Sequence, residues 1–111
     1  ADATGLALLA LSATKVSANQ SAAAVKWLTT NATGDHWESW GDADVNGSAY
    51  AVMGLSSAGK VTSGFTKYLQ SRIAPDGGIS TPWSNGAGDT YATIQGYLAL
   101  RGLSYLSLIK G

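Results

Sequence analysis

The feature that most constrains this chain is an internal repeat of about 45 residues. Three segments align without gaps: DATGLALLAL (2–11), NGSAYAVMGL (46–55) and YATIQGYLAL (91–100). Their closing leucines, Leu11, Leu55 and Leu100, are spaced 44 and 45 residues apart. A period of this length is typical of stacked supersecondary units, each of which buries its apolar face against its neighbours. The chain is therefore expected to be an array of similar units.

Segments of a different pattern lie between the repeated ones. In residues 63–73, the apolar side chains form one stripe along a helix, at Phe65, Tyr68, Leu69 and Ile73. Residues 21–30 carry a similar aromatic–leucine pair, Trp27 and Leu28. The repeated segments are instead apolar or small nearly all round, which predicts helices that are covered on both sides. We expect inner helices at 3–13, 45–57 and 90–104 and outer helices at 20–31 and 62–73, with the tail 104–110 beginning another outer helix or extending the last inner one.

Two aspartates recur in register with the repeat. Asp44 and Asp89 each stand 11 residues before a closing leucine, directly ahead of an apolar run. Aspartate is a favoured helix N-cap because its carboxylate accepts a hydrogen bond from a free backbone N–H of the first turn. We therefore expect both residues to cap inner helices.

These segments resemble the repeat of the prenyltransferase and squalene-cyclase superfamily. DTYATIQGYLAL (89–100) and YLQSRIAPDGGI (68–79) carry the resemblance, which covers nearly the whole chain as about two and a half repeats. The chain departs from the family pattern at Thr29, which stands at the usual glutamine, and at Ile79, which replaces the usual tryptophan. The resemblance implies an all-α fold, a partial α/α-toroid of helical hairpins with repeats at about 1–43, 44–88 and 89–111. The chain would then be a single domain or a fragment of a larger toroid. An ordinary helical bundle is the alternative.

Composition excludes several classes of function. Seven basic and seven acidic residues cancel, and no basic stretch could neutralise several phosphates, so nucleic acid is not an expected partner. No apolar run approaches the roughly 20 residues of a membrane span. Cysteine is absent, which rules out a zinc–thiolate site, a cysteine nucleophile and the zinc site or thioester found in some members of the superfamily. No metal site is predicted.

The segment Asp42-Ala43-Asp44-Val45 suggests one enzymatic alternative. Class II terpene cyclases carry Asp-x-Asp-Asp at the start of an inner helix, where a protonated aspartate attacks an alkene. Asp42 and Asp44 match the first two acids, while Val45 replaces the last. If this chain were a cyclase fragment, Asp44 would be the general acid. Because Asp44 recurs as Asp89, the capping interpretation is favoured over catalysis.

The single histidine and the acids around it permit two further hypotheses. His36 lies between Asp35 and Trp37 in a predicted loop, without a serine-elbow motif, so a Ser–His–Asp triad is not expected. Four acids within ten residues are enough oxygen ligands to suggest calcium: Asp35, Glu38, Asp42 and Asp44. Their spacing does not match an EF-hand loop, and a solvated loop with one helix cap is the favoured interpretation.

Three of the four tryptophans, Trp37, Trp40 and Trp83, lie in the connections from outer to inner helices, at 32–43 and 74–88. In a hairpin repeat both connections emerge at the same end of the molecule, so we expect a ligand-binding rim there formed by His36, Trp37, Trp40, Trp83 and Tyr91. The rings could stack on a flat ligand, and the helix N-termini could receive its anionic groups. The alternative is that Trp37 and Trp83, on adjacent hairpins, only fill gaps in the packing. Trp27 belongs to an outer helix and should report only on folding.

The favoured function is a non-catalytic binding module that is extracellular or at the cell surface, similar to the cobalamin carriers and bacterial surface proteins of the superfamily. A cobamide is one candidate ligand, and no cofactor is expected. The alternatives are a fragment of a terpene-cyclase-like enzyme and a structural spacer. Because a partial toroid exposes apolar edges, we also expect self-association or an adjacent domain that completes the ring.

Overall fold

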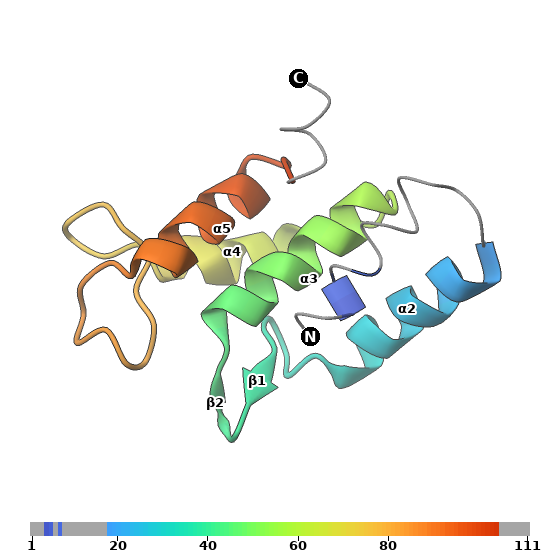
Figure 1. Ribbon diagram of the computed structural model, residues 1–111, viewed down its shortest axis with the longest axis horizontal. Coiled ribbons are helices and arrows are strands. Elements are labelled where there is room, and N and C mark those ends of the chain that lie inside the picture. Colours follow the sequence, from blue (N-terminus) through green and yellow to red (C-terminus); the bar gives the residue numbers. More distant parts are fainter. Residues whose placement is uncertain (1–3, 6, 8–17, 105–111) are drawn as a thin grey trace.

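The computed structural model describes Thr4, Gly5, Ala7 and residues 18–104, and it is mostly helical (Figure 1). Its elements in chain order are α2 (Ala18–Asn31), β1 (Glu38–Ser39), β2 (Asp42–Ala43), α3 (Val45–Ser57), α4 (Ser63–Ser71) and α5 (Thr90–Leu100). The described residues of the predicted first inner helix, Thr4, Gly5 and Ala7, are helical. The rest of that prediction, and the tail after Ser104, lie outside the described residues. Within the described part of the chain, no helix is long and apolar enough to cross a membrane.

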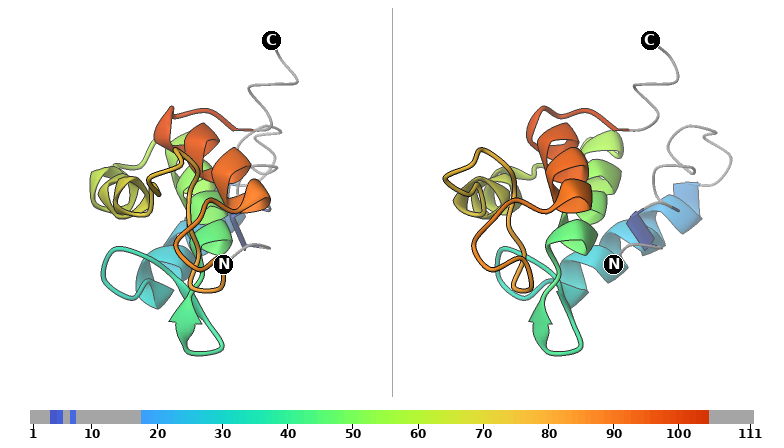
Figure 2. Two further views of the ribbon diagram at one scale, coloured as in Figure 1. Left: turned by 90° about the vertical axis from the view of Figure 1, so that its left-hand side faces the viewer. Right: turned by 60° about the vertical axis from the view of Figure 1, so that its left-hand side comes forward.

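Helix α3 is the centre of the core and is covered on both sides. One side carries Ala51 and Leu55, which pack with Leu28 of α2 and with Trp37. The other side carries Val45, Ala49, Val52 and Met53, which pack with residues of α4 and α5. Figure 2 shows α3 between α2 and α4 in the right-hand view. Residues 45–57 are apolar or small all round because other parts of the core pack against both sides of α3.

Helices α2 and α4 are covered on one side only. Each has a single fully buried residue, Leu28 in α2 and Leu69 in α4. Phe65 and Tyr68 are partly buried against the core, whereas Ile73 is largely exposed because the helix ends before it, at Ser71. The predicted apolar stripe is therefore correct except for Ile73, which lies beyond the end of α4.

Both α3 and α5 end at a glycine with positive φ. Gly59 has φ 77° and Gly102 has φ 67°. The amide N–H two residues past the C-cap then bonds a carbonyl of the last turn: Lys60 to Leu55 O (2.9 Å) and Leu103 to Leu98 O (2.9 Å). Such a left-handed closure stops a helix and satisfies its free carbonyl groups. It ends α5 at Leu100, four residues before the predicted boundary at 104.

The expectation of an all-α chain is wrong in one detail. Residues 38–43 form a two-stranded antiparallel hairpin in which Glu38 pairs with Ala43 and Ser39 with Asp42. Its turn consists of Trp40 and Gly41, with φ 58° and 83°. Two consecutive positive φ values match the right-handed twist of the strands they connect, as in other tight hairpins. Tryptophan is not a typical residue at the first of these positions, so the sequence pattern concealed the turn.

The two later repeats lie side by side in register. Helices α3 and α5 run in the same direction in Figure 1. The Gln95 side-chain amide donates a hydrogen bond to the Tyr50 hydroxyl (2.9 Å), and the two residues are 45 positions apart. Equivalent positions of consecutive repeats therefore meet across the helix pair.

Candidate functional site

The connections α2–α3 and α4–α5 leave the same end of the helices (Figure 1). This follows from the alternation of helix directions, since α2 and α4 both end where α3 and α5 begin. The first connection contains the β-hairpin, and the second contains a longer series of turns. The residues predicted to form a rim all belong to this end of the molecule.

A common backbone frame holds the two connections. The Trp37 N–H donates to the Ser48 hydroxyl (2.9 Å), and the Trp37 carbonyl accepts from the Asp44 N–H (2.8 Å). In the next repeat, the Ile79 N–H donates to the Thr93 hydroxyl (2.8 Å), and its carbonyl accepts from the Asp89 N–H (2.8 Å). Each hydroxyl stands four residues after its helix cap. Ile79 is therefore the structural counterpart of Trp37.

The placement of Trp37 on the ligand rim is wrong. Its side chain is only 2% exposed. The indole N–H donates to the Leu28 carbonyl (2.9 Å), and the ring packs against Phe65 with 4.6 Å between centroids. A ring enclosed in this way cannot stack on a ligand. Trp83 lies in the neighbouring connection, as expected, but Ile79 and not Trp83 is the counterpart of Trp37 in the repeat.

Three of the predicted aromatic residues are open to solvent. Trp40, at the tip of the β-hairpin, is 99% exposed. Trp83 lies in the turns between Thr81 and Gly88 and is 66% exposed, and Tyr91 lies in the first turn of α5 and is 68% exposed. The connection turns at Asn85 and Gly86, which have φ 54° and 79°. These three rings, rather than all four indole and phenol rings proposed for the rim, are available to a ligand.

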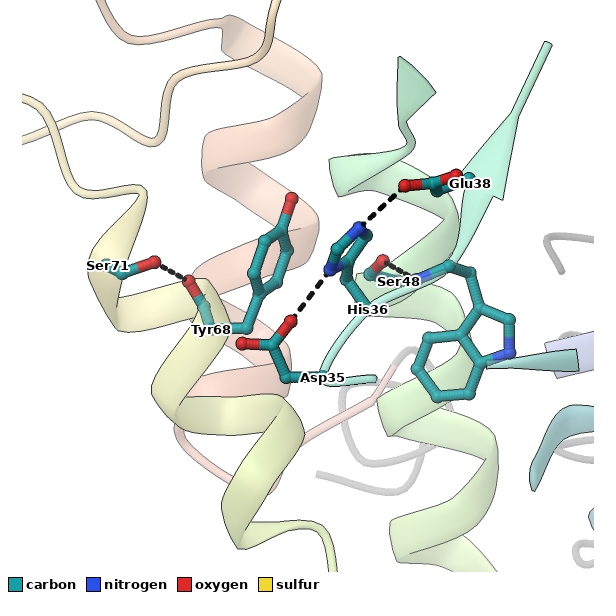
Figure 3. Close-up of polar contacts among 7 residues, drawn as sticks. Asp35, His36, Glu38, Ser48, Tyr68 and Ser71 are labelled. Atoms are coloured by element: carbon teal, nitrogen blue, oxygen red, sulfur yellow. Dashed lines mark hydrogen bonds and ion pairs between the residues drawn. The ribbon is translucent and has the colours of Figure 1, made fainter. Parts of the chain in front are cut away.

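His36 is held between two carboxylates (Figure 3). Its Nδ1 lies 2.7 Å from Asp35 Oδ1, and its Nε2 lies 3.2 Å from Glu38 Oε2. The imidazole also stacks on Tyr68 of α4, with 4.7 Å between centroids and 21° between planes. A neutral imidazole has one donor and one acceptor nitrogen, so only the protonated ring can donate to both carboxylates. His36 thus links the first connection to α4, and both of its ring nitrogens contact carboxylates.

The charges around this cluster shift two pKa values. Partial burial lowers the pKa of His36, but the hydrogen bonds and charges of Asp35 and Glu38 outweigh it and raise this pKa above its usual value. Burial raises the pKa of Tyr68, and the nearby acids add to this effect while Arg72 opposes it. At neutral pH the Tyr68 phenol is therefore neutral, and the aromatic stack carries no negative charge of its own.

The pKa shift of His36 predicts a pH-dependent contribution to stability. Because its pKa is higher in the folded chain than in the unfolded chain, the contribution is fully present below about pH 6.5 and is lost as pH rises through the folded-state pKa. We expect the difference in unfolding free energy between the native chain and His36→Gln to shrink between about pH 5.5 and about pH 8.5. Urea unfolding at both pH values measures it. His36 is the only histidine, so an NMR titration with a midpoint at or below about 6.5 would contradict the prediction.

Asp44 and Asp89 occupy the N-cap positions of α3 and α5. Asp44 Oδ1 accepts from the Gly47 N–H (2.8 Å), and Asp89 Oδ2 accepts from the Ala92 N–H (2.9 Å). The second oxygen of Asp44 accepts from the Ser39 hydroxyl (2.8 Å), which anchors β1 to the start of α3. Asp42 is exposed on β2. The other two acids considered for calcium, Asp35 and Glu38, both contact His36. No group of three potential metal ligands occurs among the described residues.

A further acid, Asp76, holds the two ends of the second connection together. Its two carboxylate oxygens accept from the Gly78 N–H (2.9 Å) and the Gly88 N–H (2.9 Å), and these bonds lower the pKa of Asp76. The two glycines touch, since a Cβ on Gly88 would lie 2.6 Å from the Gly78 Cα. Together with Asp89, Thr90, Thr93 and Ile94 they line an open cleft of about 390 Å³ at the start of α5.

Two features of this end were not predicted from the sequence: the hydrogen bonds from Gly78 and Gly88 to Asp76, and the stacking of Tyr68 on His36. Asp76-Gly-Gly78 follows Pro75 and signals a turn, but its partner Gly88 lies 12 residues away from Asp76 and has no local signature. Tyr68 appeared only as a member of an apolar stripe. Its contact with His36 depends on how α4 packs, which no spacing rule predicts.

Comparisons of this chain with models of protein families, with curated proteins and with solved structures each found no match.

Proposed function

We propose that this chain is a non-catalytic binding module that receives its ligand on Trp40, Trp83 and Tyr91, at the end where the two connections meet. The observation that carries the proposal is the state of Trp40. This indole is 99% exposed at the tip of a hairpin, and its backbone has φ 58°. A left-handed conformation costs a non-glycine residue roughly 1–2 kcal/mol. A large apolar ring held in solvent at such a cost is best explained by contact with a ligand.

The architecture proposed with this function is an open arc of an α/α-toroid. Its support is the common frame of the two connections and the register of α3 and α5, in which Tyr50 and Gln95 meet at a separation of 45 residues. In such an arc the exposed rings lie beside the N-termini of inner helices. We propose an extracellular or cell-surface location because the chain has few charged residues, 13% of the total, and is rich in serine and threonine.

The ligand class follows from the chemistry of this end. Exposed indole and phenol rings favour flat or apolar faces, such as those of sugars, corrinoids and isoprenoids. The net charge of zero offers no general attraction for polyanions. A cobamide is one candidate, since it combines a flat macrocycle with polar groups. A spacer without ligand is the competing hypothesis.

A terpene-cyclase-like enzyme is the less favoured alternative. The proposed general acid, Asp44, would have to be protonated in an apolar cavity. Instead both of its oxygens accept hydrogen bonds, from Gly47 N–H and from the Ser39 hydroxyl. Both oxygens of Asp44 are thus taken up by local donors at the start of α3, and the neighbouring Asp42 is exposed. These contacts suit a helix cap.

Tryptophan fluorescence during titration tests the proposed function. Cobamides, isoprenoid phosphates and oligosaccharides are added to the native chain and to Trp40→Phe and Trp83→Phe. We expect saturable quenching that at least one of these substitutions removes, because each takes away an indole at the proposed contact. The buried Trp37 should not respond directly.

Trp27 provides the matched control. It is 45% exposed and lines a shallow hollow of about 290 Å³ on α2 with Ala23, Lys26, Thr30 and Asn31. If quenching survives both rim substitutions and disappears in Trp27→Phe, the ligand binds on α2 and the proposed site is wrong. No response to any of the three ligand classes would favour the spacer.

A further inference from the structure

Helix α5 carries an apolar face that the described residues leave uncovered. Tyr91, Ile94 and Leu98 follow one another at i, i+3 and i+7 and form one stripe, with Tyr97 beside it. Tyr91 is 68%, Ile94 50% and Tyr97 38% exposed, and Leu98 is half-buried. The buried residues of the helix, Ala92, Gln95, Gly96 and Ala99, lie on the opposite side.

The equivalent face of α3 is completely covered. Counting 45 residues back from Ile94, Tyr97 and Leu98 leads to Ala49, Val52 and Met53. These three are at most 1% exposed and belong to the core shared with α4 and α5. One repeat thus uses this face as a helix-packing surface, whereas in the next repeat the larger Ile94 and Tyr97 take these places and are exposed. A contiguous apolar patch of this kind marks an interaction surface.

We propose that this face of α5 pairs with the same face of a second copy of the chain, with the two α5 helices antiparallel. The arrangement is isologous, so each apolar side chain meets an apolar side chain of the other copy. Charge complementarity favours it. Arg101, the C-cap of α5, is exposed and makes no ion pair with the described residues, while Asp89 is the N-cap of the same helix. Antiparallel packing brings Arg101 of each copy to the end of α5 that carries Asp89 in the other.

The pairing adds an assembly property to the chain and is independent of the ligand proposal, except at Tyr91, which contributes to both surfaces. The net charge of zero means that two copies do not repel each other as a whole. One helix face is a small interface, so the dimer is expected to be weak and concentration-dependent rather than permanent.

Sedimentation equilibrium of the full chain over a wide range of concentrations tests the proposal. We expect the average mass to rise from the 11.3 kDa of the monomer towards twice that value. Ile94→Asp should weaken dimerisation at least tenfold, about 1.4 kcal/mol, and Arg101→Glu should weaken it while reducing its dependence on salt. Val61→Asp is the matched control, because Val61 is 86% exposed in the α3–α4 connection and should leave dimerisation unchanged.

Cross-linking supplies an independent readout that does not require a destabilising charge. The chain has no cysteine, so Ile94→Cys introduces a single thiol near the expected two-fold axis. Under mild oxidation it should form a disulfide-linked dimer much faster than Val61→Cys. A chain that stays monomeric at every concentration would overturn the proposal, as would a dimer that ignores both Ile94→Asp and Arg101→Glu. A monomer whose Ile94 face binds a different protein would overturn it too.

Discussion

Replacing Trp37 with alanine is expected to lower the free energy of unfolding by about 3–5 kcal/mol. The ring is almost completely buried between α2, α3 and α4, in contact with Leu28 and Phe65. The substitution removes this packing, leaves a cavity and deprives the Leu28 carbonyl of its hydrogen bond from the indole. Because a domain of this size is stable by only about 5–15 kcal/mol, the variant should lose a large share of its stability. Urea unfolding followed by circular dichroism measures the loss.

Two matched variants separate burial from the loss of an aromatic ring. Trp40→Ala removes the same side chain three residues later, where it is 99% exposed, and should change the unfolding free energy by less than about 0.5 kcal/mol. Trp37→Phe keeps most of the packing and loses the hydrogen bond, so its cost should be intermediate. If Trp37→Ala were as stable as Trp40→Ala, Trp37 would not be a core residue, and its place on the ligand rim would have to be reconsidered.

Replacing Asp44 with alanine is expected to cost about 1–2 kcal/mol. The substitution leaves the Gly47 N–H without its partner and also removes the acceptor of the Ser39 hydroxyl, so both α3 and the hairpin lose an anchor. Asp89→Ala, which breaks one such bond at Ala92, should cost about 1 kcal/mol. Chemical unfolding of the two variants in parallel makes the comparison.

Substitution with asparagine distinguishes a cap from a catalytic acid. Asparagine is a good N-cap because its amide oxygen can accept the same hydrogen bond, so Asp44→Asn should retain most of the stability lost in Asp44→Ala. If Asp44→Asn were as unstable as Asp44→Ala, the hydrogen bond of a helix cap would not be what Asp44 contributes, and the cyclase hypothesis would regain support.

The difference between Trp37 and Trp40 shows where sequence reasoning reaches its limit. Both are tryptophans in the same predicted connection, and no local rule separates them. Trp37 is buried because its carbonyl and amide are tied to Asp44 and Ser48, which aims the ring at α2. Trp40 is exposed because the hairpin turn carries it beyond the core. Both outcomes depend on backbone contacts made several residues away.

Part of the proposed site could be predicted from the sequence, and part could not. Trp40, Trp83 and Tyr91 could be named from the sequence because they lie in or next to the long connections, although the same argument also named the buried Trp37. The hydrogen bond from Gly88 to Asp76 and the stacking of His36 on Tyr68 could not be predicted, because each joins positions that only the packing of α4 and α5 brings together.

The sequence by itself determined the helical class, the extents of the helices to within a few residues and the aspartates at the starts of α3 and α5. Helical periodicity and capping act over three or four residues, so a short window of sequence contains all the physics they need. Only the tertiary structure decided that 38–43 forms a hairpin, that Ile79 takes the place of Trp37, and that one face of α5 remains open. Those outcomes depend on which surfaces meet, and burial is a property of the neighbours of a residue as much as of the residue itself.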